Sequence, residues 1–307
     1  MNDTLILPRY FIIEPTNVCN YRCPICPNRF FAPNEKGSME WGLFESLIDQ
    51  IKGAAHVIQL YWMGEPILHP QLSDMIKLCK AKTTAKVMLS TNGALMTSAV
   101  ADRLLDSGID EIIVSLDAAE NQDIYGIVRT GGLLSAVNTK VEYLLSANKG
   151  RANIVLQFID MYINRSEQTK FKARWSRPDC SVSIQCLYTW SNQIPALNLA
   201  SDNLSPVAKK PRVACADLWH KMSIHWDGKI SVCCFDWNST VTIGNATKHN
   251  LVDVWNGDAI SALRDAHKSR QYNCNSLCNE CDAWAEPDEY VALFNLGQSN
   301  DVEDANV

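Results

Sequence analysis

Three cysteines stand close together near the start of the chain, at Cys19, Cys23 and Cys26. Thiolates are soft ligands that suit zinc or an iron–sulfur cluster. One short loop lets three thiols reach three corners of a four-iron cube, which leaves the fourth iron open to chelation by a small amino acid group. The alternative is a zinc loop that a distant fourth ligand completes.

A second group of cysteines lies in the last third of the chain. Twelve residues separate Cys215 from Gly228, and four more separate this glycine from Cys233. Cys278 and Cys281 then form a C-x2-C pair. The chain has 12 cysteines and no secretory signal, so metal ligation explains their grouping better than disulfides do.

The elements that would position these residues are read from the hydrophobic pattern. Apolar, β-branched runs alternate with amphipathic stretches, which predicts repeated β-α units around a parallel sheet. The predicted strands are Arg9–Pro15, Val57–Met63, Ala85–Ser90, Glu111–Leu116, Asn153–Asp160 and Ser181–Tyr188. The predicted helices are Trp41–Lys52, Gln71–Lys82, Thr97–Ser107, Leu133–Asn148 and Glu167–Trp175. Six such units close only part of a barrel, so we expect an open side.

Polar residues follow the second, third and fourth predicted strands, and the first cysteine group follows the first. The polar segments are Met-Gly-Glu-Pro at 63–66, Ser-Thr-Asn-Gly at 90–93 and Ser-Leu-Asp at 115–117. In β/α barrels the carboxyl ends of the strands carry the active site, so these segments fall where a site is expected. Taken singly, each is also an ordinary turn or helix cap.

The composition changes after the sixth strand. Residues 192–212 contain three prolines among small polar residues, which indicates a linker between a barrel domain at 1–191 and a second domain at 213–288. In the second domain we expect short strands around Trp226–Gly228, a Gly244-Asn245 turn and one helix near Leu251–His267. Residues 289–307 read as a tail.

The overall charge and hydropathy exclude several partners. The formal charge of −6 is spread without long runs of one sign, which argues against nucleic acid. The apolar stretch Tyr10–Ile13 is far too short to span a membrane or to act as a signal segment. We therefore expect a cytoplasmic protein without membrane contact.

Together the motifs resemble the radical S-adenosylmethionine superfamily. The C-x3-C-x2-C spacing is similar to its signature, and Gly64-Glu65 resembles its Gly-Gly-Glu motif with Met63 in place of the first glycine. The resemblance covers residues 9–190 and implies an α/β fold, a partial (β/α)6 TIM-like barrel. It implies that Cys19, Cys23 and Cys26 hold a four-iron cluster. It also implies cosubstrate contacts from Gly64, Glu65, Ser90, Asn92, Ser115, Asp117 and Arg129, with Glu65 on the methionyl amino group.

The second cysteine group resembles the twitch or SPASM appendage of the same superfamily. In that appendage a hairpin turn with a glycine brings two cysteines together, and a later pair completes a second four-iron cluster. The ligands implied are Cys215, Cys233, Cys278 and Cys281, with Cys274 as a substitute. Six cysteines in this segment are too few for a full SPASM domain, which favours the one-cluster form. Cys79, Cys180 and Cys186 are expected to be buried structural residues.

The resemblance implies that the chain makes a 5′-deoxyadenosyl radical and removes a hydrogen atom from a substrate, with an external flavodoxin or ferredoxin as reductant. In layout it is similar to family members that oxidise an aminocyclitol in butirosin biosynthesis or epimerise a centre in neomycin biosynthesis. We therefore expect a small polar substrate, an amino sugar or aminocyclitol. Since Cys19 follows a single strand, we expect no leader-binding domain of the kind that peptide-modifying relatives carry.

The candidates for residues that act on the substrate come from both parts of the chain. Asp236, Arg174 and Gln157 are polar and near the predicted site edges, and of these Asp236 has a basic form at neutral pH. Cys234 or Cys274 would return a hydrogen atom if the reaction inverts a centre, whereas a packing role is the alternative for Cys234.

Two other functions stay open at this point. One is a peptide-modifying maturase of the same superfamily, acting by epimerisation or crosslinking. The other is an iron–sulfur or zinc protein for electron transfer, with no radical chemistry.

Overall fold

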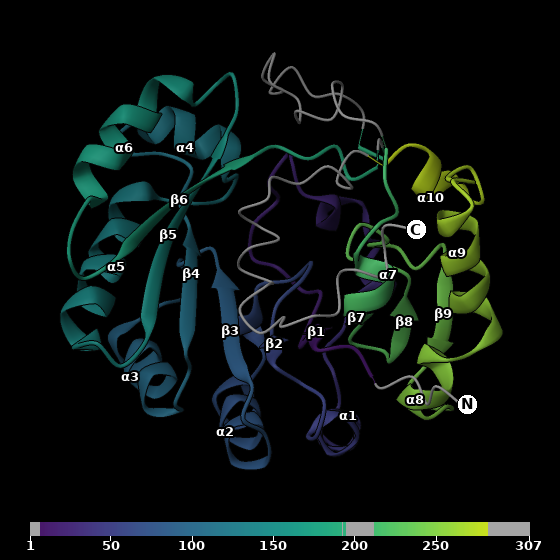
Figure 1. Ribbon diagram of the computed structural model, residues 1–307. Coiled ribbons are helices and arrows are strands. Elements are labelled where there is room, and N and C mark those ends of the chain that lie inside the picture. Colours follow the sequence, from purple (N-terminus) through teal and green to yellow (C-terminus); the bar gives the residue numbers. More distant parts are fainter. Residues whose placement is uncertain (1–6, 192, 195–211, 282–307) are drawn as a thin grey trace.

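The computed structural model describes residues 7–191, 193–194 and 212–281 of the chain. Six parallel strands follow one another along its first two thirds (Figure 1). These strands are β1 (Tyr10–Ile13), β2 (Val57–Gln59), β3 (Lys86–Thr91), β4 (Glu111–Ser115), β5 (Asn153–Asp160) and β6 (Ser181–Cys186). All six predicted strands are present, and the predicted partial barrel is confirmed.

The last third of the described chain continues the same sheet. Its strands are β7 (Lys221–Ile224), β8 (Lys229–Ser231) and β9 (Thr242–Asn245). The nine-stranded sheet has the order β6-β5-β4-β3-β2-β1-β7-β8-β9, and β7 lies parallel to β1 with Tyr10 opposite Lys221. Strands β8 and β9 add to it in antiparallel fashion. The C-terminal part is therefore joined to the open edge of the barrel by backbone hydrogen bonds.

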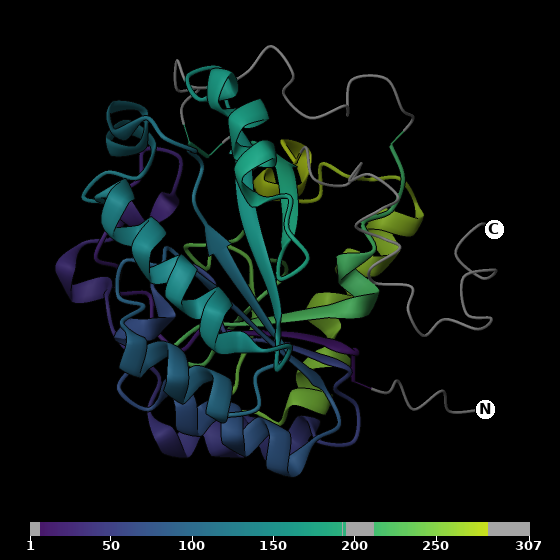
Figure 2. The ribbon, with the colours of Figure 1, turned by 90° about the vertical axis from the view of Figure 1, so that its left-hand side faces the viewer.

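Helices cover one face of the curved sheet, as Figures 1 and 2 show. In the barrel they are α1 (Trp41–Ile51), α2 (Leu72–Lys82), α3 (Ser98–Asp106), α4 (Gln122–Val128), α5 (Leu134–Asn148) and α6 (Gln168–Trp175). The C-terminal part has α7 (Asp217–His220), α8 (Leu251–Trp255), α9 (Asp258–Lys268) and α10 (Ser276–Asn279). Short 3-10 helices are η1 (Pro27–Phe30), η2 (Pro33–Glu35), η3 (Pro66–Leu68) and η4 (Arg165–Glu167).

Side chains alternate along the strands between the helix-covered face and the other face. In β3, Val87, Leu89 and Thr91 are buried, whereas Met88 and Ser90 are only half buried. The period of two arises because successive side chains of a strand point to opposite faces. The apolar face packs with the helices in one continuous core, and the half-buried face of the barrel strands stays available for a site.

Two local expectations were wrong, and one helix was missed. Residues 251–267 form two helices, because Asn256 and Gly257 end α8 and Gly257 is the N-cap of α9. The Gly244-Asn245 pair lies inside β9, where Gly244 packs so closely on Val254 that an added Cβ would come within 2.6 Å of its side chain. Helix α4, which Asn121 caps, was not predicted because its seven residues give too short a periodic signal.

Two further expectations concern single residues and boundaries. Cys79 is buried as predicted, but Cys180 is only half buried, and Cys186 is exposed at the end of β6, which is an edge strand of the sheet. The predicted linker at 192–212 lies almost wholly outside the described residues, as does the tail at 289–307. The domain boundaries therefore stay predictions.

Candidate functional site

The first cysteine group lies on the loop after β1 and is braced by its own backbone. The amide of Tyr21 donates to the Cys19 Sγ at 3.4 Å, and the amide of Cys26 donates to the Cys23 carbonyl at 3.1 Å. The amide of Arg22 donates to the Thr130 carbonyl at 3.0 Å, which ties the loop to the segment after α4. The three thiols are thus presented from one fixed turn.

Gly64 lets the segment that follows β2 approach this loop. The amide of Glu65 donates to the Val18 carbonyl at 2.8 Å, and a Cβ at Gly64 would lie only 2.0 Å from the Thr16 carbonyl oxygen. Any side chain there would collide with backbone, so the position requires glycine. The close approach places Glu65 beside the cysteine loop.

Glu65 is a buried carboxylate held by three donors. Its Oε1 accepts from the Thr91 hydroxyl at 2.7 Å and from the Ile67 amide at 3.2 Å, and its Oε2 accepts from the Asn92 amide at 2.8 Å. The residue is 2% exposed. Burial raises the pKa of Glu65, although these hydrogen bonds and the Arg129 charge oppose the rise. A cationic amino group beside it would favour the charged form.

The ends of β3, β4 and β5 meet next to the same loop. The Asn92 side-chain amide donates to Asn20 Oδ1 at 2.9 Å, and this bond connects the end of β3 to the cysteine loop. The Ser115 hydroxyl donates to Gln157 Oε1 at 3.1 Å. Arg174, in contrast, is exposed on α6 and lies over the Trp175 ring, away from these strand ends.

Asp117 and Arg129 form a buried ion pair at the end of β4. The Arg129 Nη2 lies 2.6 Å from the Asp117 Oδ2, and Asp117 Oδ1 accepts from the Ile159 amide at 2.7 Å. Asp117 adopts a left-handed backbone with φ of 61°, a strained conformation for a residue with a side chain. The structure thus brings two predicted cosubstrate contacts together, a pairing that the sequence analysis did not foresee.

The thiols of the loop fit a cationic metal group. Burial raises the pKa of Cys19 and of Cys23, and it raises the pKa of Cys26 to about 12, because an isolated thiolate is unfavourable there. Cys23 also raises the pKa of Cys19 and of Cys26, and Cys19 raises the pKa of Cys26, because the thiols lie close together. An iron–sulfur cluster supplies the positive charge that binds such thiols as thiolates.

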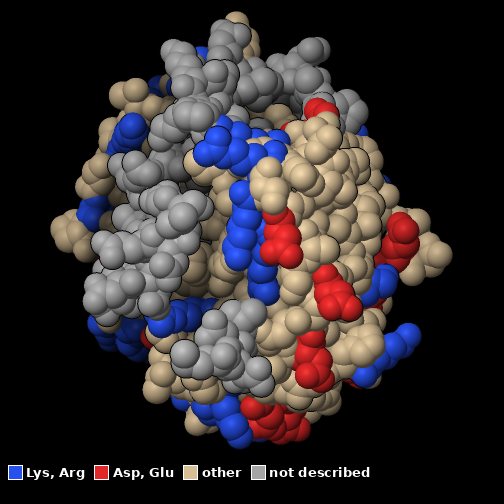
Figure 3. Space-filling view, turned by 45° about the vertical axis from the view of Figure 1, so that its right-hand side comes forward, with Lys and Arg blue, Asp and Glu red and all other residues tan. Residues whose placement is uncertain are grey.

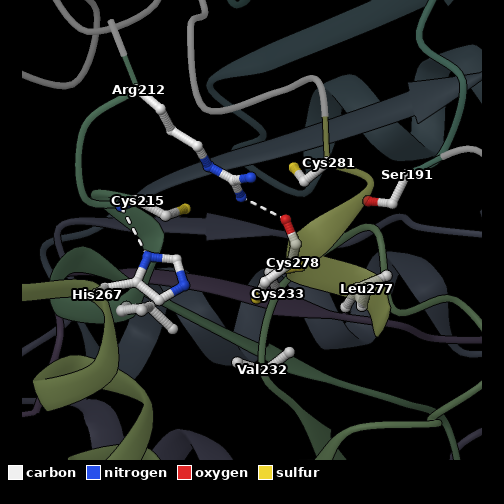
Figure 4. A pocket seen from close by; sticks show the side chains of 10 residues that line it. Ser191, Arg212, Cys215, Val232, Cys233, His267, Leu277, Cys278 and Cys281 are labelled. Atoms are coloured by element: carbon white, nitrogen blue, oxygen red, sulfur yellow. Dashed lines mark hydrogen bonds between the residues drawn. The ribbon is translucent and has the colours of Figure 1, made fainter. Parts of the chain in front are cut away.

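The second cysteine group lines one pocket in the C-terminal part (Figure 4). Cys215, Cys233, Cys278 and Cys281 come from three separate stretches of chain and surround the same space. Burial raises the pKa of Cys215 and Cys233 well above that of an ordinary thiol, and it raises the pKa of Cys278 to about 11. Four converging thiols of this kind fit a cluster with four protein ligands.

Three residues of this pocket were missed by the sequence analysis. Ser191, Arg212 and His267 line the pocket with the cysteines. Arg212 donates to the backbone carbonyl of Cys278, and His267 Nδ1 accepts from the Cys215 amide at 3.2 Å. Burial lowers the pKa of His267, and the Arg212 charge lowers it further. None of the three belongs to a motif, because only the fold brings them to the cysteines.

The residues predicted to act on the substrate differ in their surroundings. Asp236 has no exposed surface, and its carboxylate accepts from the Thr240 amide, the Thr240 hydroxyl and the Val241 amide at 2.7–3.0 Å. A role of Asp236 as proton acceptor stays a prediction. It would require the segment from Asp236 to Val241 to move so that the carboxylate can reach the substrate. Cys274 is exposed, and the side-chain amide of Asn275 donates to the sulfurs of both Cys274 and Cys278.

Cys234 lies where the two parts of the molecule meet. Its carbonyl accepts from the indole N–H of Trp62 at 2.8 Å, and its Sγ lies 4.0 Å from the Asp217 Oδ2. Trp62 follows β2 and stacks on His225 with ring centres 4.1 Å apart. The His225 ring lies 3.6 Å from the Glu14 carboxylate, at the end of β1. Cys234 is therefore held between the barrel and the second cysteine pocket.

The face shown in Figure 3 carries charged side chains of both signs. Basic side chains gather in a band through the middle of this view, and acidic side chains lie beside them. Within the described residues, no helix is both long and apolar enough to cross a membrane.

Family models match both parts of the chain. The model described as "Radical SAM superfamily" matches residues 13–167, which is half of the chain, and "Iron-sulfur cluster-binding domain" (SPASM) matches residues 215–282. These matches contain both cysteine groups. They confirm that S-adenosylmethionine and iron–sulfur clusters are the cofactors.

Two curated proteins are similar along most of their length. One is a tungsten-containing aldehyde ferredoxin oxidoreductase cofactor-modifying protein of Pyrococcus furiosus, 23% identical over 86% of this chain and 73% of its own. The other is an S-adenosyl-L-methionine-dependent 2-deoxy-scyllo-inosamine dehydrogenase of Niallia circulans, 23% identical over 88% of this chain and 91% of its own.

Solved structures share the fold. BtrN in complex with AdoMet and 2-DOIA matches with a TM-score of 0.64 and 19% identity, over 90% of this chain and 94% of its own. Streptococcus suis SuiB bound to precursor peptide SuiA matches with a TM-score of 0.67 and 16% identity, over 90% of this chain and 71% of its own. At these identities the likeness establishes the fold alone.

Proposed function

This chain belongs to the radical SAM superfamily, and from that premise we propose that it removes a hydrogen atom from a small polar substrate of the amino-sugar or aminocyclitol type. The net reaction is oxidation or epimerisation. The proposal is carried by one observation: four cysteines line a pocket, and Cys234, the residue after the lining residue Cys233, accepts a hydrogen bond from Trp62 of the barrel. A curated dehydrogenase of an aminocyclitol, similar over 91% of its length, supports the substrate class.

The barrel residues would hold the two cofactors. Cys19, Cys23 and Cys26 bind a four-iron cluster, and Glu65 accepts hydrogen bonds from the amino group of S-adenosylmethionine. When bound and reduced by an external flavodoxin or ferredoxin, this pair supplies a 5′-deoxyadenosyl radical able to take a hydrogen atom. Gly64 allows the segment after β2 to pack against the loop, and this contact fixes the position of Glu65.

The remaining predicted contacts orient the cosubstrate. Arg129 is the cation for its carboxylate, and Asp117 holds the guanidinium at 2.6 Å so that this charge is already in place. The residues that face the other polar groups are Ser90, Asn92 and Ser115. Asn92 and Ser115 are themselves hydrogen-bonded to neighbouring side chains, which limits their motion.

Oxidation of an alcohol removes one hydrogen atom, one proton and one electron from the carbinol. Cys215, Cys233, Cys278 and Cys281 would hold a second cluster with no open iron, which favours a role in receiving that electron. In the epimerisation alternative, a thiol of Cys234 or Cys274 returns a hydrogen atom to the opposite face. Cys234 is the better placed of the two, because it contacts the barrel residue Trp62.

A second candidate function is modification of a peptide. The likeness to SuiB, whose structure holds a precursor peptide, favours this alternative, although it extends over 71% of that chain. An iron–sulfur protein without radical chemistry is the remaining alternative. It predicts no 5′-deoxyadenosine under any reducing condition.

The test is a reaction in deuterated water with reduced protein, S-adenosylmethionine and 2-deoxy-scyllo-inosamine. We expect 5′-deoxyadenosine and a product two hydrogens lighter. Solvent deuterium on the substrate carbon, lost in Cys234→Ala, would establish epimerisation instead. Unchanged aminocyclitol alongside a modified peptide in a parallel reaction would contradict the proposed substrate class.

A further inference from the structure

His267 is a buried imidazole in the wall of the second cysteine pocket. It belongs to α9, is 2% exposed and packs edge-on against the Tyr272 ring, with ring centres 5.3 Å apart. The pocket that it lines is the one formed by the four cysteines (Figure 4). Its ring is thus fixed by packing next to the thiols.

The hydrogen bond at Nδ1 determines which ring nitrogen carries the proton. Nδ1 accepts from the backbone amide of Cys215 at 3.2 Å, so it holds a lone pair and no proton. In a neutral imidazole the proton is then on Nε2, which becomes a donor. The backbone amide of Cys215 therefore leaves the proton of His267 on Nε2, where it can be donated.

This donor has no partner in the described part of the chain. Nε2 is buried and makes no hydrogen bond there, although leaving such a group unpaired costs about 1–3 kcal/mol. In Figure 4 this nitrogen faces the side of the pocket where Cys233 and Cys278 lie. Ligand atoms of His267, Cys274 and Cys278 lie within 4.8 Å of one another. The missing partner therefore belongs in the pocket.

We propose that the Nε2–H of His267 donates a hydrogen bond to a sulfur of the metal group held by the four cysteines, and that this bond raises the reduction potential of that group. The inference rests on the proposed function, because it requires a cluster in the second pocket. A donor stabilises the extra negative charge of the reduced form more than that of the oxidised form. His267 is thus a positioning residue that tunes electron acceptance.

Direct ligation by His267 is the competing role. Ligation through Nε2 would require this nitrogen to lose its proton while Nδ1 still accepts from Cys215, which leaves an imidazolate in a buried site. Four thiols already line the pocket. A donor to sulfur satisfies both ring nitrogens without that additional charge.

The experiment isolates the second cluster by using the full chain with Cys19, Cys23 and Cys26 replaced by Ala. In this background we compare His267→Phe, which removes the donor, with His267→Gln, which keeps an N–H donor. His249→Phe is the matched control, because His249 is an exposed histidine of the same region and bonds Asn245 instead. Iron content and the reduction midpoint, followed by electron paramagnetic resonance, are measured for each protein.

We expect His267→Phe to keep about four irons. Its midpoint falls by the equivalent of about a tenfold change in the ratio of reduced to oxidised cluster, about 59 mV for one electron. His267→Gln recovers part of this change, and His249→Phe has none. An unchanged midpoint in a folded His267→Phe protein would overturn the proposal. Loss of iron from folded His267→Phe would also overturn it, by making His267 a ligand.

A second measurement needs no change at His267 and decides the case if His267→Phe does not fold. In the same background, protein labelled with nitrogen-15 histidine is studied by electron–nuclear double resonance in the reduced state. We expect a proton coupling that disappears in deuterated water and only a weak nitrogen coupling. A strong nitrogen coupling, or no exchangeable proton, contradicts the hydrogen bond. Absence of any cluster in the background protein would instead contradict the proposed function.

Discussion

The two cysteine sites of this molecule are assembled by different routes. In the barrel, three thiols come from eight consecutive residues, and the segments after β2, β3 and α4 brace that one loop by hydrogen bonds. In the C-terminal part, four thiols come from three stretches spread over residues 215–281, and the pocket between them is closed by His267 and Arg212. The first site is local in sequence, whereas the second exists only once the chain has folded.

Because of this difference, the two sites depend on different supporting contacts. The loop needs a rigid support, and Gly64 provides it by allowing the segment after β2 to pack directly against the backbone at Thr16. The second pocket needs its distant parts held in register, and the Cys215 amide, His267 and Arg212 connect those parts by hydrogen bonds. A change in the loop should therefore act on one cofactor, and a change in the pocket should act on the other.

The largest expected effect comes from removing the loop thiols. Replacing Cys19, Cys23 and Cys26 together with Ala should reduce the iron content from about eight to about four per chain, because only the second cluster remains. No 5′-deoxyadenosine should form. Iron analysis and chromatography measure both. A triple variant that kept all its iron would contradict the assignment of the loop thiols to a cluster of their own.

The converse change should remove substrate turnover but not cosubstrate cleavage. Cys281→Ala deprives the second pocket of one of its four thiols, so we expect about four irons, no product and continued formation of some 5′-deoxyadenosine. Cys186→Ala is the control, because Cys186 is exposed on β6 and outside both sites. Full turnover by Cys281→Ala would show that the second cluster is dispensable.

A smaller effect is expected from a change beside the loop that spares all thiols. Glu65→Gln removes the negative charge that we assign to binding the amino group of S-adenosylmethionine. It also places the N–H donors of the new side chain next to a group that donates to Glu65, the Thr91 hydroxyl or the Asn92 amide. The cosubstrate should bind about 10- to 100-fold more weakly, as for loss of a charge-assisted hydrogen bond, with iron unchanged. Equilibrium titration measures the affinity, and Glu35→Gln, an exposed carboxylate on η2, is the control.

The loop site could be predicted from the sequence more completely than the second pocket, because its residues are close together in the chain. The spacing of the loop cysteines and the periodicity of the six barrel strands could be read from the sequence, since each depends on neighbours in the chain. Glu65 was predicted only through the resemblance of its motif to that of the family. His267 could not be predicted, because its role depends on α9 packing next to Cys215, 52 residues away. The pairing of β7 with β1 was likewise hidden, as edge pairing leaves no local pattern. The Asp117–Arg129 ion pair joins two residues that were each predicted, but not their contact.

The smallest expected effect concerns the support of the barrel site from a distance. Glu167, at the end of η4, accepts from the backbone amides of Ala119, Glu120 and Asn121, just after Asp117. Burial alone would raise the pKa of Glu167, but these three amides outweigh it and hold the pKa below the usual 4.5. The carboxylate thus stabilises the turn that positions Asp117.

Glu167→Gln should lower the free energy of unfolding by about 1–3 kcal/mol at neutral pH, because the three amides that donate to Oε2 would then meet a neutral amide oxygen instead of a carboxylate. Since the pKa of Glu167 is lower in the folded chain than in the unfolded chain, its contribution is complete above about pH 5 and is lost as the pH falls through the folded value. The difference in urea denaturation between wild type and variant should therefore be constant from pH 8 to about pH 5 and then shrink. Iron-free protein is used, so that acid release of iron does not contribute.

The control is Glu120→Gln, an exposed carboxylate 3.2 Å from Lys170, for which we expect a change within about 0.5 kcal/mol. A difference that grew as the pH fell would contradict the lowered pKa, and the brace on Asp117 would then have to come from another group.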